Sequence, residues 1–238
     1  FVNWTDANGN VVSTEAEFKP GKNANNVYEA ATYTANFVKP TVSLDDWTYG
    51  ENAKEENPSV AGPGSNAYAE PTYTYYAEGS ETALQAKPTN AGKYKVVATW
   101  AATDNLPQLT AEDTFTINKR TLKIYSEKTE AYTGTSIVYN IEQRLAENTT
   151  LADGDQIAAL SASITGTEVN TYDVLDAIAE TDNKNFTITI KKGEEDVTAN
   201  YDVTVAGKLT ITKADVASYN ATVSLDDWTY GENAKEEN

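Results

Sequence analysis

The sequence predicts an all-β protein made of consecutive antiparallel β-sandwich modules. One segment, Thr41–Asn57, returns without a single change as Thr222–Asn238, which is the mark of a modular array. Short stretches in which apolar and polar residues alternate indicate half-buried strands, and turn residues separate them. Two such stretches, Phe115–Lys119 and Leu209–Lys213, have similar sequences, so two modules are expected to end with the same kind of strand.

Residues 1–40 are predicted to form part of a small β-rich repeat. Alternation places Tyr33, Ala35 and Phe37 on one face of a strand. The other expected elements are a strand at Phe1–Trp4, an Asn-Gly turn within Asp6–Asn10, a returning strand at Val11–Val12, and an end to the last strand at Pro40. So few strands are marginal alone, and we expect either that the front half of this module is missing from the sequence or that the segment leans on its neighbour.

Residues 41–118 are predicted to form the first complete module. Its clearest strand is Lys93–Trp100, in which Tyr94, Val96, Ala98 and Trp100 share the core face. The other expected elements, in order, are a strand that ends at Gly50, a charged turn over Glu51–Glu56, a loop over Ala61–Asn66, a strand at Thr72–Tyr76 and a closing strand at Phe115–Ile117.

Residues 119–213 are predicted to form a second module, and residues 214–238 a linker with the first strands of the next repeat. The expected elements of the second module, in order, are a strand at Thr121–Tyr125, a strand and turn over Ser136–Leu145, a turn at Leu151–Asp155, a strand at Leu160–Ile164, one helical turn through Val174, Leu175 and Ile178, a strand at Phe186–Ile190, a turn at Gly193 and strands from Tyr201 to Lys213. The copy Thr222–Asn238 cannot make a core alone, so we expect it to dock on the preceding sandwich or to pair along an edge of another chain.

The composition supports packed domains and argues against several classes of partner. Hydrophobic residues make up 39% of the chain, which is enough to build cores. The 36 acidic residues outnumber the 18 basic ones, and a net charge of −18 repels nucleic acid and anionic lipid surfaces. We therefore expect no nucleic-acid partner and no membrane insertion, and we interpret the acidity as a source of solubility.

Cysteine and histidine are both absent. The chain therefore has no disulfide framework, no thiolate nucleophile and neither of the usual nitrogen and sulfur ligands of zinc. No apolar run is long enough to cross a bilayer, and no signal peptide opens the sequence. Methionine is absent even at position 1, which indicates a piece of a longer polypeptide whose export and anchoring signals lie elsewhere.

Several motifs resemble repeats of bacterial surface proteins. In residues 1–40 the pattern FxxWxDxNGxVVST, followed by ATYTANF, resembles the InlB B-repeat type of Listeria and Bacteroides surface proteins. In residues 41–118 the matching segments resemble the MBG type of Ig-like module and are Trp47–Gly50, Pro88–Tyr94, Ala98–Thr99 and Phe115–Ile117. In residues 119–213 they resemble the YDG type and are Ala131–Thr135, Leu151–Asp155, Val197–Tyr201 and Gly207–Ile211, although Thr133 stands where that family usually has Asp.

The resemblance implies tandem Ig-like antiparallel β-sandwich modules in an elongated array, within an exported, repetitive bacterial adhesin. We accordingly expect a non-enzymatic, extracellular stalk segment, secreted or attached to the cell wall, that spaces a distal binding region from the cell and contacts neighbouring repeats. One alternative is a module that itself binds a host glycan, mucin or protein through exposed aromatic residues. Another is an accessory module of a carbohydrate-active enzyme.

The candidate metal-binding and catalytic groups are carboxylates in turns. Asp45–Asp46, its copy Asp226–Asp227, and Asp153–Asp155 offer oxygens for Ca²⁺, but none continues into the ladder of an EF-hand loop. The simpler interpretation is that these aspartates are solvated residues of turns. A glycosidase also needs two carboxylates, yet acids are so plentiful here that suitable pairs arise by chance. We predict no catalytic residue, no bound metal and no cofactor.

Aromatic residues and lysines are the remaining candidates. Trp47 and Trp228 hold the same place in the repeat and could stack on sugars, but core packing is the expected role, as it is for Tyr73, Tyr75 and Tyr76. Lysine–asparagine isopeptide crosslinks occur in some long bacterial stalks and are testable here, although the sequence does not predict one. N-glycosylation sequons without meaning in a bacterial protein begin at Asn3, Asn148, Asn185 and Asn220.

Overall fold

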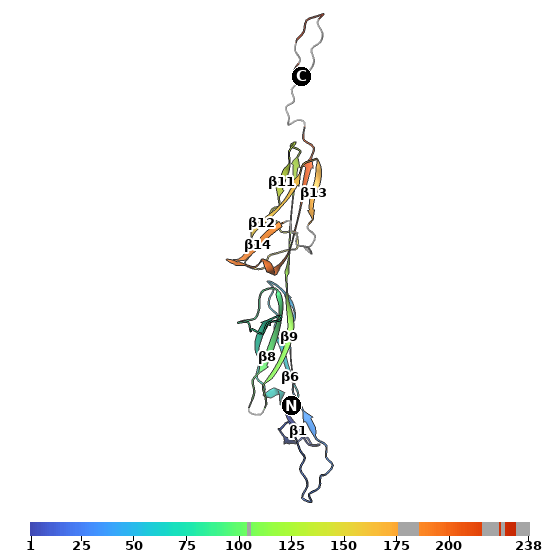
Figure 1. The fold of residues 1–238 in the computed structure, drawn as a ribbon, viewed down its shortest axis with the longest axis vertical. Helices are drawn as coiled ribbons and strands as arrows, with labels where there is room; N and C mark the ends of the chain where they lie inside the picture. The colour runs from blue at the N-terminus through green and yellow to red at the C-terminus, as the bar shows by residue number, and fades with distance from the viewer. Residues whose placement is uncertain (104–105, 176–185, 216–223, 225–226, 232–238) are drawn as a thin grey trace. The chain divides into compact units, whose positions relative to one another are not determined.

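The computed structural model describes residues 1–103, 106–175, 186–215, 224 and 227–231. Within these residues the regular elements are sixteen β-strands and two short 3₁₀ helices at Ser65–Ala67 and Thr198–Asn200, so the all-β prediction is confirmed (Figure 1). Contacts divide the chain into two compact units. Unit 1 is Phe1–Arg120 with Ala199–Tyr201, and unit 2 is Thr121–Thr198 with Asp202–Asn238.

Unit 1 opens with a three-stranded sheet in the order β2-β1-β3, whose strands are Asn3–Thr5 (β1), Val11–Ser13 (β2) and Thr34–Asn36 (β3). The expected hairpin is present between β1 and β2. The Asp6 carboxylate accepts hydrogen bonds from the backbone N–H groups of Asn8 and Asn10, both at 2.9 Å, and Gly9 takes the left-handed conformation that the turn requires, with φ +82°.

Aromatic rings pack against this small sheet. The Trp4 ring lies 5.8 Å from Phe1 and 6.0 Å from Phe18, and Phe18 makes an edge contact with Tyr33 at 4.9 Å. The predicted strand was expected to include Phe37 on the same face as Tyr33, but β3 ends at Asn36. The side chain of Phe37 is 61% exposed, and its ring makes an edge contact with Phe1 at 5.7 Å between ring centroids.

Two further sheets form the rest of unit 1. A two-stranded sheet pairs Lys39–Ser43 (β4) with Asn57–Ala61 (β6), and a four-stranded sheet has the order β5-β9-β8-β7, with Trp47–Thr48 (β5), Thr72–Ala77 (β7), Gly92–Trp100 (β8) and Leu109–Asn118 (β9). The strand β5 runs parallel to β9, so the expectation of a purely antiparallel module is wrong here. The chain passes from β4 to β5 through Leu44–Asp46 alone, without a hairpin, and β5 joins the second sheet beside β9.

The strand β4 includes Pro40, which was expected to end the preceding strand. A proline has no backbone N–H to give to a ladder, and it is tolerated because β4 pairs on one side only, with β6. The strand β6 also contains a proline, Pro58, which lies opposite Val42. This strand falls in a stretch that sequence reasoning did not assign to a strand.

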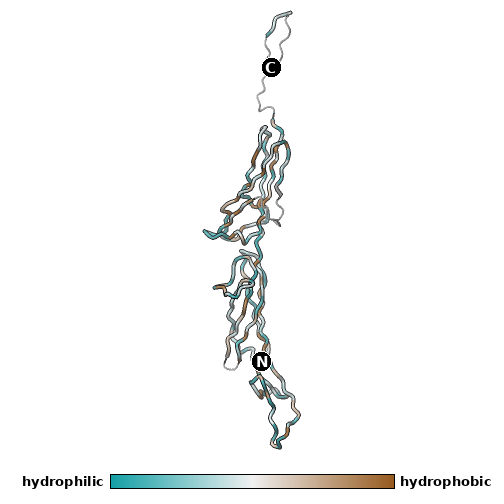
Figure 2. The backbone as a smooth tube through the Cα atoms, in the orientation of Figure 1, coloured by the Kyte–Doolittle hydropathy of each residue, from teal (hydrophilic) through white to brown (hydrophobic). Residues whose placement is uncertain are grey.

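The core of these sheets follows the predicted alternation. In β8 the side chains of Val96 and Ala98 are fully buried and Trp100 is 3% exposed, while Lys93 points to solvent. The other buried hydrophobic residues of this core are Val42, Leu44, Trp47, Tyr49, Tyr75, Leu106, Phe115 and Ile117. Figure 2 shows hydrophobic and hydrophilic residues interspersed along the strands, as half-buried strands require.

Unit 2 also contains two sheets. The first has the order β10-β16-β13, with strands Arg120–Ala131 (β10), Asn170–Leu175 (β13) and Tyr201–Thr212 (β16). The second has the order β11-β12-β14-β15, with strands Ile137–Asn140 (β11), Asp155–Gly166 (β12), Phe186–Lys192 (β14) and Glu195–Asp196 (β15). The expected helical turn at Val174 and Leu175 is wrong, because these residues end β13 opposite Gly207 and Ala206 of β16; Ile178 lies outside the described residues.

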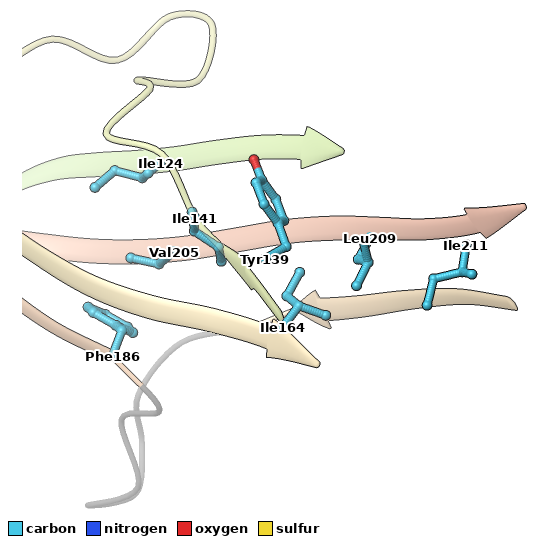
Figure 3. Packing of buried hydrophobic residues seen from close by; sticks show 8 residues of the cluster. All are labelled: Ile124, Tyr139, Ile141, Ile164, Phe186, Val205, Leu209 and Ile211. Atoms are coloured by element: carbon cyan, nitrogen blue, oxygen red, sulfur yellow. The ribbon is translucent and has the colours of Figure 1, made fainter. Parts of the chain in front are cut away.

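The core of unit 2 draws on both of its sheets (Figure 3). Ile124, Val205, Leu209 and Ile211 come from the first sheet. The second sheet and the residue that follows β11 contribute Tyr139, Ile141, Ile164 and Phe186. The Tyr139 hydroxyl lies within this core and donates a hydrogen bond of 2.6 Å to the hydroxyl of the buried Ser126. Each of these two buried hydroxyls thus has a hydrogen-bond partner.

Candidate functional site

The repeated segment Thr41–Asn57 occupies a defined seat in unit 1. We call this the repeat seat: residues 58–61 of β6 and the strand β9, together with the side chains of Tyr75 and Lys87. Val42 lies opposite Pro58 of β6, and Trp47 lies opposite Ile117 of β9. The contacts described in the next three paragraphs join the segment to this seat.

Two carboxylates fix the segment at β9. The Asp113 side chain of β9 accepts a hydrogen bond of 2.9 Å from the backbone N–H of Leu44. In the other direction, the Asp46 carboxylate accepts one of 2.6 Å from the backbone N–H of Thr116. Hydrogen bonds to a charged acceptor are the stronger kind, so these two set the register of the segment.

Trp47 is the central apolar contact of the segment. Its side chain is 4% exposed and its ring stacks on Phe115 with 5.2 Å between ring centroids. The Lys87 ammonium lies 5.8 Å from the Trp47 ring centroid, within the range of a cation–π contact. Trp47 is therefore a core residue, which agrees with the structural role expected for it and leaves it unable to stack on a sugar.

Glu56, Lys87 and Tyr75 form a largely buried polar cluster beside Trp47. The Lys87 ammonium lies 2.8 Å from the Glu56 carboxylate, and the two side chains are 24% and 9% exposed. The Tyr75 hydroxyl donates a hydrogen bond to the same carboxylate, and Lys87 also donates to the backbone carbonyl of Lys54. The cluster thus ties the end of the repeated segment to the rest of unit 1.

The cluster shifts the pKa values of its members. Burial by itself raises the pKa of the Glu56 carboxyl, but hydrogen bonds from Lys87 and Tyr75 outweigh it, and the net pKa lies below 4.5. Burial raises the pKa of Tyr75 strongly, and its hydrogen bond to Glu56 raises that pKa further. Glu56 is therefore ionised and Tyr75 is protonated at neutral pH.

An open groove of about 690 Å³ lies on the same unit, lined by residues of β7, β8, β9 and the turn after β7. Its charged residues are Asp46, Glu78, Glu81, Lys93 and Lys95. Lys93 and Glu78 are 3.9 Å apart and both well exposed, so their attraction is weak and each remains able to contact a ligand. Such a lining suits a polar, hydrogen-bonding ligand.

The structure does not bring the predicted acidic candidates together. Asp46 is used by the backbone of β9, as described above, and Asp45 is exposed. In the second module Asp153 is exposed, whereas Asp155 is buried at the start of β12. Among the described residues, no three Asp or Glu side chains gather where they could hold a metal ion.

The copy of these acids and the other candidates are placed as follows. Asp226 lies outside the described residues, while Asp227 is exposed. Tyr73 and Tyr76 are half-buried, and Lys95 lies 5.3 Å from the Tyr76 ring centroid. The ammonium of Lys87 contacts the Glu56 carboxylate and not an asparagine side chain. Of the sequon asparagines, Asn3 accepts a hydrogen bond from Asn36, Asn148 has φ +62°, and Asn185 and Asn220 lie outside the described residues.

Sequence reasoning missed the polar cluster. Glu56 was assigned to a charged turn and Lys87 was not singled out, because residues so far apart in the chain show no common pattern. One signal was present, since Glu56 and Trp47 both belong to the segment that repeats without change.

No family model, curated protein or solved structure matches this chain. Over the part of the chain that the structure describes, we find no helix with the length and apolar character needed to span a membrane.

Proposed function

We propose that this chain is a structural spacer, a non-enzymatic segment of the stalk of an adhesin. The observation that carries the proposal is the use of the repeated segment: Val42, Leu44, Trp47 and Tyr49 are all buried in unit 1. The apolar residues of a sequence that is identical in its two copies are thus used to build a core. Repetition of a packing segment is what an array of modules requires.

The proposal extends to the kind of module and its location. The two pairs of sheets support tandem Ig-like sandwiches of the MBG and YDG types, and the segment β1–β3 supports an InlB B-repeat-like module before them. On this proposal the protein is extracellular, secreted or attached to a bacterial cell wall, and its regular partners are neighbouring repeats. The excess of acidic residues supports such an exposed setting, because like charges keep crowded proteins apart.

A display experiment tests the spacer function. A reporter domain that binds a large soluble partner is anchored to a cell surface through this chain, through unit 1 alone, or through a short flexible linker. If the chain is a spacer, access of the partner to the reporter should fall in that order. Equal access with all three anchors would contradict the proposal. A partner that binds the chain without the reporter would also contradict it.

The groove favours one second candidate, a module that binds a host glycan through polar contacts. The Lys93 ammonium can donate hydrogen bonds there and the Glu78 carboxylate can accept them. Binding on a glycan array that is lost in Lys93→Ala and Glu78→Gln, and kept in the control Lys123→Ala of unit 2, would favour this candidate. Trp47→Ala cannot serve in such a test, because Trp47 is buried and its loss would disturb the fold.

A further inference from the structure

One edge of β6 is free among the described residues. The strand pairs with β4 in a sheet of two, so its second edge has no strand beside it there. Its side chains alternate, because Pro58 and Val60 are half-buried while Ser59 is exposed. Within the described part of the chain, no hydrogen bond outside the ladder with β4 reaches the backbone of Val60. This edge can therefore accept a further strand.

The prolines of this sheet show which backbone groups face outward. Pro40 lies opposite Val60, and Pro58 lies opposite Val42. A proline nitrogen has no hydrogen to donate, so these pairs are the non-hydrogen-bonded pairs of the antiparallel ladder. The N–H of Leu44, two residues after Val42, agrees with this, since it donates a hydrogen bond of 2.9 Å to a carboxylate of β9 and not to β6. The outward groups of β6 are thus the N–H and C=O of Val60 and the C=O of Pro58.

An open groove of about 260 Å³ borders this edge. It is lined by three consecutive residues of β6, by residues from the 65–71 segment and by Trp100. The Tyr68 hydroxyl donates a hydrogen bond of 2.8 Å to a backbone carbonyl of the segment before β9, which holds that side of the groove in place. The volume lies below the roughly 300 to 1,000 Å³ of ligand pockets, but it has room for one or two side chains. Glu70 is the charged residue of the lining and is exposed.

We propose that the free edge of β6 is a docking site for an extended, basic peptide segment of another protein. The segment adds to the sheet of β4 and β6 as a third, antiparallel strand. Its residue opposite Val60 exchanges two backbone hydrogen bonds with that residue, and its residue opposite Pro58 donates one to the proline C=O. The side chains of these two peptide residues lie on the same face of the sheet as Val60 and Pro58, which places them at the groove.

Charge decides which kind of peptide fits. The chain carries a net charge of −18, so an acidic segment, including a second copy of this chain, is repelled. A lysine or arginine side chain can lay its aliphatic stem along Tyr68 and Pro71 and bring its charge to Glu70. The proposal adds a binding site to the chain and depends neither on the spacer function nor on the groove beside β7, which has a different lining.

Synthetic peptides capped at both ends test the site on the full chain by NMR. The lysine peptide Thr-Lys-Thr-Lys-Thr presents both charges on one face of a strand, Thr-Lys-Lys-Thr-Thr has the same charge without that alternation, and Thr-Glu-Thr-Glu-Thr reverses the charge. At millimolar concentration we expect the first peptide to shift the Val60 amide signal and slow its hydrogen exchange, the second to do so less and the third not at all. Equal effects of the three peptides, or no effect of any, would overturn the proposal. Protection of Val60 that grows with protein concentration alone would also overturn it, because a second copy would then occupy the edge.

Variants of the chain separate the backbone contacts from the charge. Val60→Pro removes the outward N–H and leaves the hydrogen-bonded pairs with β4 in place, so the lysine peptide should bind roughly tenfold more weakly. Glu70→Gln changes an exposed side chain and keeps the test valid if the proline disturbs β6; a loss of roughly 2- to 5-fold is expected. The control Glu147→Gln, exposed in unit 2, should bind as the wild type does. Unchanged binding in Glu70→Gln, or an equal loss in Glu147→Gln, would overturn the proposal.

Discussion

Glu56 shows how a single ionised side chain can join two distant parts of the chain. Its carboxylate accepts hydrogen bonds from Lys87 and Tyr75, and its side chain is only 9% exposed. Removal of its charge therefore leaves these two donors without a charged acceptor. Hydrogen bonds to charged groups contribute about 1.5 to 3 kcal/mol each when partners are well placed. The stability of unit 1 should therefore depend on Glu56 more than on the exposed Lys93–Glu78 ion pair.

Glu56→Gln should lower the free energy of unfolding of unit 1 by about 1 to 3 kcal/mol at pH 7. The pKa of Glu56 is lower in the folded state, so its contribution is complete above pH 4.5 and is lost as the pH falls below that value through the folded-state pKa. Urea unfolding at pH 7 and pH 3 should show a difference in unfolding free energy between wild type and variant that is smaller at the lower pH. Glu55 is exposed, so the control Glu55→Gln should change the free energy of unfolding little. A difference between wild type and Glu56→Gln that does not vary with pH would contradict the argument.

At the scale of strands, close approach between sheets limits which residues fit. Gly207 of β16 lies against the core of unit 2, and a Cβ added there would meet the Ile141 side chain at 2.8 Å and Ile164 at 3.1 Å. Gly207→Ala should destabilise unit 2 by roughly 1 to 3 kcal/mol through overpacking. Thermal unfolding followed by circular dichroism measures this. Gly21→Ala, whose Cβ would meet nothing within 4 Å, is the control, and an equal loss of stability in both variants would contradict the packing argument.

Sequence patterns predicted some strands well and others poorly, for identifiable reasons. The strand β8 was predicted because its buried face, including Val96 and Ala98, alternates with a face that carries Lys93, Lys95 and Thr99. In β6 the run around Pro58 has no such alternation, and it forms a strand only because β4 lies beside it. Val174 and Leu175 match helical spacing with Ile178, yet pairing with β16 overrides that local signal.

The site was less predictable than the strands. Repetition identified Thr41–Asn57 as a unit, and the core role of Trp47 was expected from its type and place. The seat itself depends on which residues the fold brings to that segment, such as Lys87 and Asp113, and no short-range pattern contains this information. The parallel pairing of β5 with β9 is of the same kind, since strand direction is set by tertiary contacts.

At the scale of the whole molecule, net charge governs how copies of the chain meet. With a net charge of −18 at pH 7 and a pI near 4.3, two chains repel one another at neutral pH, and this repulsion opposes any association of copies. Screening shortens the range of repulsion from about 10 Å at 0.1 M salt to about 3 Å at 1 M. The seat itself is less sensitive, because the Glu56–Lys87 pair is largely buried.

Copies of the chain should therefore associate more readily in 1 M than in 0.05 M NaCl at pH 7, because screening weakens the repulsion between them. Sedimentation velocity at the two salt concentrations would measure the shift. Dissociation caused by salt would instead mean that ionic contacts between chains hold the copies together.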